Sequence, residues 1–217
     1  MMTDKQHRRS AGGFTLIELM IVIGILSLLM VALQPAISSA FGRSEAAETR
    51  ARMLLLDTAI KSFDEEYGYF PPDDFQERGS ELGVTVPRDP VNTGIESLVV
   101  FLSWSANGGT DLTENEKWLG NTDADESEVL IPLLERTAKV EVLDAWGSPI
   151  VYFHNRGYAQ SQTVRLASGD DVKVKAINNP NSQGYLSPRK FQLISAGEDG
   201  AFGTEDDLTH PELPPPN

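Results

Sequence analysis

The sequence predicts an α+β protein in which a long N-terminal helix packs on a small antiparallel β-sheet domain. Three observations predict this fold: an apolar run followed by an amphipathic helical pattern, short β-favouring runs in the last third of the chain, and an acidic, glycine-rich loop after them. With 217 residues, 40% of them hydrophobic, the chain is long enough for one core and an appendage. We therefore expect one globular domain carried by an N-terminal helix.

Charge and cysteine content exclude several classes of function. The formal net charge is −14, with 32 acidic against 18 basic residues, which argues against binding to a nucleic-acid backbone. The chain has no cysteine, so disulfides, thiolate metal sites and a cysteine nucleophile are excluded. Metal binding through oxygen ligands is compatible with this composition.

Residues 14–33 form an apolar run that is long enough to span a membrane. Its polar residues are Thr15, Glu18 and Ser27, and 20 helical residues extend over roughly 30 Å, the thickness of the hydrocarbon core. We therefore predict a single membrane-spanning helix at this position.

The residues before this run are basic. Lys5, Arg8 and Arg9 stand against Asp4, and the positive-inside rule keeps such a segment in the cytoplasm. The large domain is therefore predicted to be extracytoplasmic. The alternative is a secretory signal cut after Ala40, but the apolar run is longer than the usual 7 to 15 residues or so and contains an ionisable side chain.

Glu18 lies inside the apolar run, where a carboxylate costs about 2.5 to 3.5 kcal/mol. No Lys or Arg occurs between Phe14 and Phe41, so Glu18 must protonate, reach the headgroups or pair with another polypeptide. If the chain were cut between Gly13 and Phe14, the new α-amino group would lie one helical turn from Glu18. Pairing of these two charges between molecules would set the axial register of an assembly.

The string from Gly12 to Glu18, GGFTLIE, resembles the prepilin-peptidase site of type IV pilins and type II secretion pseudopilins. The resemblance implies cleavage after Gly13, methylation of the new N-terminal residue Phe14, and a role for Glu18 in filament assembly. It implies a homo-oligomeric filament anchored in the inner membrane. The implied partners are prepilin peptidase, membrane lipid, other pseudopilins and the inner-membrane secretion platform, and no nucleic acid.

The chain after the apolar run divides by pattern. The stretch from Phe41 to Tyr67 is amphipathic, with Ala47, Ala51, Leu55, Ala59, Phe63 and Tyr67 spaced four apart, and Gly68 ends it. We assign the segments as follows: 1–13 leader peptide, 14–34 transmembrane and assembly helix, 35–68 amphipathic helix, 69–143 variable region with an insertion, and 144–217 β-sheet and acidic loop.

The variable region carries weak signals. Its apolar block, from Ile95 to Trp104, fits a short helix or a buried strand. Asp123 and Asp125 resemble the start of an EF-hand loop, but Glu128 stands where the glycine should be and Leu134 where the closing glutamate should be. We interpret this string as a solvated acidic loop.

The last third of the chain is typical of strands and turns. Four β-favouring runs separated by Gly, Asn, Pro and Ser predict an antiparallel sheet: Ile150 to His154, Thr163 to Leu166, Asp171 to Ile177 and Lys190 to Ser195. The hexapeptide from Asp144 to Pro149, DAWGSP, resembles the turn that leads into the first sheet strand of the secretion pseudopilins.

The loop from Ser195 to Leu208 concentrates negative charge. Three aspartates and two glutamates fall within ten residues, beside three glycines that allow the backbone to fold tightly. Such charges repel one another without a cation, and calcium (Ca2+) prefers carboxylate and carbonyl oxygens in flexible loops. The loop therefore predicts a calcium site, with a solvated acidic turn as the alternative.

The resemblance implies which residues hold the ion. The major pseudopilin of type II secretion has a calcium loop here, in which an aspartate is followed seven and eight residues later by an Asp-Asp pair. Asp199, Asp206 and Asp207 match this spacing and are the implied ligands, whereas Glu198 and Glu205 do not match.

These features predict a structural subunit of a type II secretion pseudopilus, which supports protein export, and not an enzyme. The three histidines are scattered, and the sequence has no metalloprotease helix, nucleophile elbow or phosphate loop. The alternative is a type IV pilus subunit or a minor pilin with an adhesive or binding role. Fibre pilins commonly close a C-terminal loop with a disulfide, which this chain cannot form.

Overall fold

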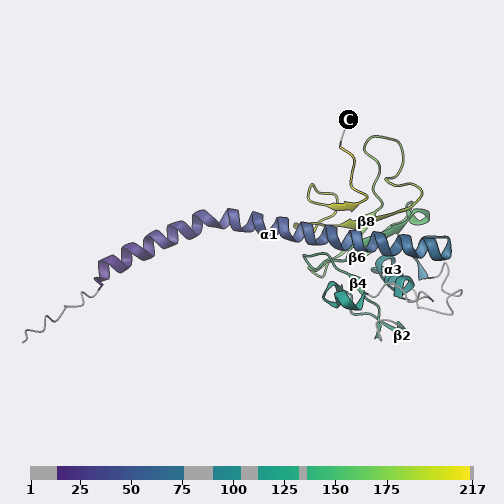
Figure 1. The fold of residues 1–217 in the computed structure, drawn as a ribbon, viewed down its shortest axis with the longest axis horizontal. Helices are drawn as coiled ribbons and strands as arrows, with labels where there is room; N and C mark the ends of the chain where they lie inside the picture. Colours follow the sequence, from purple (N-terminus) through teal and green to yellow (C-terminus); the bar gives the residue numbers. More distant parts are fainter. Residues whose placement is uncertain (1–13, 76–89, 104–111, 132–135, 216–217) are drawn as a thin grey trace, which may run out of the picture. The chain divides into compact units, whose positions relative to one another are not determined.

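The computed structural model describes residues 14–75, 90–103, 112–131 and 136–215 (Figure 1). The chain divides into two compact units, residues 1–42 and residues 43–217, and helix α1 (Leu16–Tyr67) contributes to both. The second unit combines helices with antiparallel strand pairs. The predicted α+β class with an N-terminal apolar helix is therefore confirmed.

The helical elements that the structure describes are few. They are α1 (Leu16–Tyr67), α3 (Thr93–Ser103) and the 3-10 turns η1 (Thr113–Trp118) and η2 (Asn155–Gly157). Helix α1 ends before Gly68, whose φ of +78° suits a glycine and whose amide donates to the carbonyl of Asp64 at 2.8 Å. The predicted helix end at Gly68 is therefore confirmed.

The second half of α1 buries one face in the second unit. Thr49, Met53, Leu56, Ile60 and Phe63 are buried, at alternating spacings of four and three residues. The predicted stripe of every fourth residue is wrong at its start, where the first two alanines of that stripe are exposed. A spacing of four drifts about 40° around the helix at each step, so a strict four-residue stripe leaves the buried face.

Helix α3 is buried along almost its whole length, from Gly94 to Ser103. The apolar block of the variable region is therefore a helix and not a strand. Gly94 is needed for close packing, because a Cβ there would lie 2.4 Å from the carbonyl oxygen of Tyr152. The helix contacts β4 and β5, so it covers part of the sheet region.

The strands are short and pair antiparallel. They are β1 (Leu119–Gly120), β2 (Glu126–Ile131), β3 (Arg136–Ala138), β4 (Glu141–Val142), β5 (Val151–His154), β6 (Ser161–Arg165), β7 (Asp171–Lys175), β8 (Phe191–Ser195) and β9 (Leu208–His210). Strands β5, β8 and β9 form a three-stranded sheet, while β1 pairs with β4, β2 with β3, and β6 with β7. The four runs predicted in the last third correspond to β5, β6, β7 and β8, and are confirmed.

The three-stranded sheet separates two hydrophobic clusters. Tyr152 and Leu193 are cross-strand partners that face the larger cluster, which also contains residues of α1 and α3. Val151 and Ile194, the neighbouring pair, face the smaller cluster formed with β6 and β7. This alternation is the two-residue period of a strand buried on both faces. In Figure 1 the second half of α1 runs past β8.

The turn before β5 is held by a buried aspartate. The carboxylate of Asp144 accepts hydrogen bonds from the amides of Trp146 at 3.0 Å and Ser148 at 2.9 Å, and from the hydroxyl of Ser195 at 2.7 Å. Gly147 supplies the positive φ of +90° that the turn requires. The predicted turn from Asp144 to Pro149 therefore leads into the sheet as expected.

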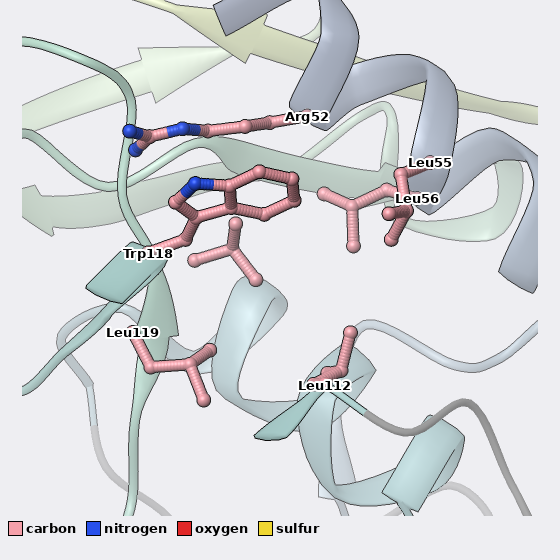
Figure 2. Close-up of a pocket in the computed structure, with 7 residues that line it drawn as sticks. Arg52, Leu55, Leu56, Leu112, Trp118 and Leu119 are labelled. Atoms are coloured by element: carbon pink, nitrogen blue, oxygen red, sulfur yellow. The ribbon is translucent and has the colours of Figure 1, made fainter. Parts of the chain in front are cut away.

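A small apolar cavity lies beside this turn (Figure 2). The guanidinium carbon of Arg52 lies 5.2 Å from the centre of the Trp118 ring, and Arg52 donates to the carbonyls of Leu143 at 2.6 Å and Asp144 at 2.8 Å. The cavity volume is about 10 Å³, which is room for about one water molecule. Arg52 therefore fastens α1 to the turn, and the cavity is too small for an organic ligand.

Candidate functional site

The predicted processing site lies at the start of the described chain. Gly13 lies outside the described residues. Phe14 lies two residues before the start of α1, and its side chain is 81% exposed. Glu18 lies in the first turn of α1. Phe14 and Glu18 therefore lie within one helical turn of each other at the start of the described chain.

Thr15 and Glu18 form a reciprocal cap at the N-terminus of α1. The amide and the hydroxyl of Thr15 donate to Oε2 of Glu18 at 2.9 Å and 2.7 Å, and the amide of Glu18 donates back to the Thr15 hydroxyl at 3.3 Å. Threonine followed three residues later by glutamate is the capping-box sequence, and it satisfies amides that a helix start leaves unpaired. This intramolecular partner of Glu18 was not predicted, although the Thr-x-x-Glu spacing is visible in the sequence.

The apolar segment of α1 has the dimensions of a membrane span. Residues Leu16–Gln34 form a 19-residue apolar stretch, and none of it is buried against the rest of the described chain. A continuous apolar surface of this size requires lipid or other apolar helices around it. Together with the predicted prepilin-type sequence, this stretch indicates a membrane anchor.

The acidic loop connects two paired strands. It follows Ser195 at the end of β8 and precedes Leu208 at the start of β9, and these two residues face each other in the sheet. The sequence analysis placed the loop after the last strand, which is wrong because β9 follows it. Strand β9 has three residues, too few for a β-pattern to be recognised.

Hydrogen bonds hold the three predicted aspartates within the loop. Oδ2 of Asp206 accepts from the amide of Asp199 at 2.9 Å, and Oδ1 of Asp206 accepts from the hydroxyl of Thr204 at 2.6 Å. Oδ2 of Asp207 accepts from the amide of Gly203 at 2.7 Å. These contacts fold the loop so that the carboxylates of positions 206 and 207 both lie beside Thr204, whose hydroxyl is also 3.5 Å from Oδ1 of Asp207.

The environments of Asp206 and Asp207 differ. The hydroxyl of Thr204 and the amide of Asp199 hold the pKa of Asp206 below its usual range, whereas partial burial raises the pKa of Asp207, as do the charges of Asp206 and Asp199. Each carboxylate oxygen has two lone pairs, so oxygens that accept one hydrogen bond retain capacity for a cation. The donor set of hard oxygens therefore fits calcium chemistry.

A second acidic group is more tightly gathered than the loop. Within the described parts of the chain, the group of three acidic side chains with one oxygen each within 4.8 Å of the others is Glu96, Asp123 and Glu141; the three loop aspartates are not brought this close. The carboxylate oxygens of Asp123 and Asp125 are shielded from solvent. The interpretation of this string as a solvated acidic loop is therefore wrong for Asp123 and Asp125, whereas Ala124 and Glu126 are exposed.

Comparison with known families addresses the N-terminus. Residues 8–33 match the model of the prokaryotic N-terminal methylation motif. Neither the curated proteins nor the solved structures gave a match to this chain. The motif spans the end of the basic leader, the Gly13-Phe14 junction, Glu18 and most of the apolar segment. Together with the apolar helix, the motif indicates a type IV pilin-like prepilin signal joined to a helix that is long and apolar enough to cross a membrane.

Proposed function

We propose that this chain is a structural subunit of a type II secretion pseudopilus, which supports protein export across the cell envelope. The observation that carries the proposal is the methylation motif over residues 8–33, joined to an apolar helix that has no partner in its own described chain. In this proposal prepilin peptidase cuts after Gly13, Phe14 becomes the methylated N-terminus, and the domain after the span faces the periplasm.

The segment division carries over into this proposal. Residues 1–13 are the leader, 14–34 the transmembrane and assembly helix, 35–68 the amphipathic helix, 69–143 a variable region, and 144–217 the sheet and calcium loop. The expected partners are further copies of the chain, other pseudopilins and the inner-membrane secretion platform. The exposed apolar side chains of the span supply the surface for contacts with lipid and with neighbouring helices.

Glu18 is the proposed assembly residue. Its carboxylate caps its own helix through Thr15, but one of its oxygens, Oε1, is not used by the cap. That oxygen is available for the α-amino group of a neighbouring subunit's processed N-terminus. The pair would be formed between molecules in a low-dielectric surrounding, where an opposite charge contributes most.

Asp199, Asp206 and Asp207 are the proposed calcium ligands of the β8–β9 loop. The support is their spacing, their oxygen chemistry and their partial exposure, which leaves the loop open to an ion from solvent. Bound calcium would neutralise their repulsion and fix the loop between the two strands. A calcium loop in a chain without cysteine favours the secretion pseudopilus over a fibre pilin that closes this region with a disulfide.

A gene deletion in the source bacterium tests the proposal. The expected result is loss of type II-dependent enzymes from the culture medium, with surface pili and twitching motility unchanged. Complementation with the wild-type chain should restore secretion and Glu18→Val should not, whereas Glu65→Gln, at an exposed position of the same helix, should restore it. Normal secretion with loss of pili or of adhesion would instead assign the chain to a pilus, as a fibre or minor subunit.

A further inference from the structure

Three buried or half-buried carboxylates from distant parts of the sequence converge in the second unit. Glu96 comes from the first turn of α3, Asp123 from the connection between β1 and β2, and Glu141 from β4. One oxygen from each lies within 4.8 Å of the others, and both glutamates have no exposed surface. Buried carboxylates are this close only where something offsets their repulsion and their lost hydration.

Lys139 is a cation that contacts this group of carboxylates. The ammonium group of Lys139 pairs with Asp125 and lies 3.5 Å from Oε2 of Glu96. Burial and the neighbouring carboxylates raise the pKa of Glu96 to about 9, and that of Glu141 to about 7.

One oxygen of Glu96 has no hydrogen-bond donor. Oε1 is shielded from solvent and accepts no hydrogen bond from the residues that the structure describes. A buried acceptor of this kind costs free energy unless a ligand occupies it. The unfilled oxygen belongs to the same carboxyl group that takes part in the 4.8 Å cluster. It is a second indication, independent of the clustering, that a positive ligand belongs here.

The neighbouring side chains hold Glu141 in position for such a ligand. Asn92 donates to its Oε1 at 2.7 Å, and the amide of Thr122 lies 3.2 Å from its Oε2. Asn92 is itself held by two further hydrogen bonds. Its backbone N–H donates to the carbonyl of Thr163 at 2.9 Å, and its side-chain oxygen accepts from the backbone N–H of Arg165 at 3.0 Å. Glu141 therefore has a defined orientation before any ion binds.

We propose that Glu96, Asp123 and Glu141 bind a calcium ion between α3, the β1–β2 connection and β4. Calcium binds oxygen at about 2.3 to 2.6 Å, so ligands on opposite sides of one ion lie about 4.6 to 5.2 Å apart. Three oxygens that all lie within 4.8 Å of one another can therefore share one calcium ion. Magnesium, with ligands at about 2.0 to 2.1 Å, requires a tighter octahedral set. The site is separate from the β8–β9 loop and does not depend on the assignment to a pseudopilus.

Calcium at this position would join three segments of the variable region, one of which, α3, belongs to the larger hydrophobic cluster. The three ligands belong to segments that are far apart in sequence, and one of them is the buried helix α3. An ion shared by these segments gives them a common attachment that apolar packing alone does not supply. The internal alternative is that Lys139 and a protonated Glu96 complete the cluster, and the experiment below distinguishes the two.

Calorimetric titration of the full-length chain tests the proposal. The protein is purified in uncharged detergent, freed of metal with chelator and titrated with calcium chloride. All variants carry Asp206→Asn and Asp207→Asn, so that the loop makes no contribution. We expect one calcium ion per chain in this background and the same value with Glu126→Gln, an exposed acid in the adjoining strand. Asp123→Asn should weaken binding at least tenfold.

A folding control keeps the result interpretable. Asp123→Asn leaves Lys139 with Asp125 and Glu96, and its melting temperature in chelator measures whether the fold tolerates the change. Glu141→Gln is the second variant, since the glutamine can still accept from Asn92 and Thr122. Both variants should lose the calcium-dependent rise in melting temperature. Absence of calcium binding in the background, retention of affinity within twofold in both variants, or a larger thermal shift with magnesium would overturn the proposal.

Discussion

The hydroxyl of Thr15 donates a hydrogen bond of 2.7 Å to the carboxylate of Glu18, so the acid within the apolar segment caps the first turn of its own helix. The cap gives Glu18 a structural role besides the proposed pairing with another subunit. The two roles are separable, because Thr15→Ala removes the hydroxyl and leaves the carboxylate, while Glu18→Val removes the carboxylate.

We predict that Glu18→Val inserts into the membrane as well as the wild type or better, because a costly carboxylate is removed, yet does not assemble. Thr15→Ala should cost the helix about 1 kcal/mol of capping free energy and still assemble. Insertion is measured by alkaline extraction of membranes, and assembly by cross-linking between subunits. If Thr15→Ala abolishes cross-linking as completely as Glu18→Val, the cap and not an intermolecular ion pair explains the need for Glu18.

The contact between Asp57 on α1 and His210 on β9 predicts an acid-sensitive stability. Burial opposes ionisation of Asp57, but hydrogen bonds from Lys61 at 2.6 Å and His210 at 2.9 Å outweigh it and keep its pKa below the usual value. An acid with a lowered folded-state pKa stabilises the fold above its unfolded pKa of about 3.9, and this stabilisation is lost as the pH falls through the folded value.

Asp57→Asn should therefore lower the melting temperature at pH 7. As the pH falls below about 4, the melting temperature of this variant should decrease less steeply than that of the wild type. Glu65→Gln, at an exposed position of the same helix, is the matched control and should follow the wild-type profile. Thermal melts across this pH range measure both. An unchanged acid slope in Asp57→Asn would show that other carboxylates control the acid limb.

The β8–β9 loop should bind calcium through Asp199, Asp206 and Asp207. In full-length protein that carries Asp123→Asn, calcium at a hundredfold excess over its dissociation constant should stabilise the fold by about 2.7 kcal/mol. Adding Asp206→Asn and Asp207→Asn should abolish the shift, whereas Glu198→Gln should leave it. Equal melting temperatures in calcium and in chelator, before the loop aspartates are replaced, would show that the loop is a solvated turn.

Alanine substitutions at Gly197 and Gly200 distinguish the cost of backbone strain from the cost of steric overlap. Both have positive φ, +66° and +67°, so alanine at either position pays the same conformational cost, of order 1 kcal/mol. A Cβ at Gly197 would lie 2.4 Å from the carbonyl oxygen of Asp206, whereas a Cβ at Gly200 meets nothing within 4 Å. Gly197→Ala should therefore lower the melting temperature clearly more than Gly200→Ala. Equal losses would mean that the loop moves freely away from position 197.

The sequence predicted the elements with long, regular patterns and missed what depends on distant packing. Helix α1 and strands β5 to β8 carry their signals locally, so they were predicted. The apolar block of α3 was ambiguous because a segment buried on all sides has no polar face to reveal its period. Strand β9 was too short to detect and exists because it pairs with β8.

The candidate sites also differ in whether their sequence signal is local or depends on distant packing. The prepilin-type N-terminus is a local string, and the family match to residues 8–33 confirms its type. The cluster of Glu96, Asp123 and Glu141 could not be predicted, because the three residues stand in separate segments and Asp123 lies in a string that reads as solvated. Its carboxylate is shielded from water only in the folded chain, which the local sequence does not reveal.

The N-terminus of the mature protein tests the central account most directly. The full-length gene is expressed with prepilin peptidase, and the chain extracted from membranes is analysed by intact mass and by fragmentation of its N-terminal peptide. We predict the loss of residues 1–13 and one added methyl group on the amine of Phe14, with unprocessed precursor retained when Gly13 is replaced by a bulky residue. A mature chain that begins at Phe41, or one that keeps residues 1–13 in the presence of the peptidase, would contradict the account.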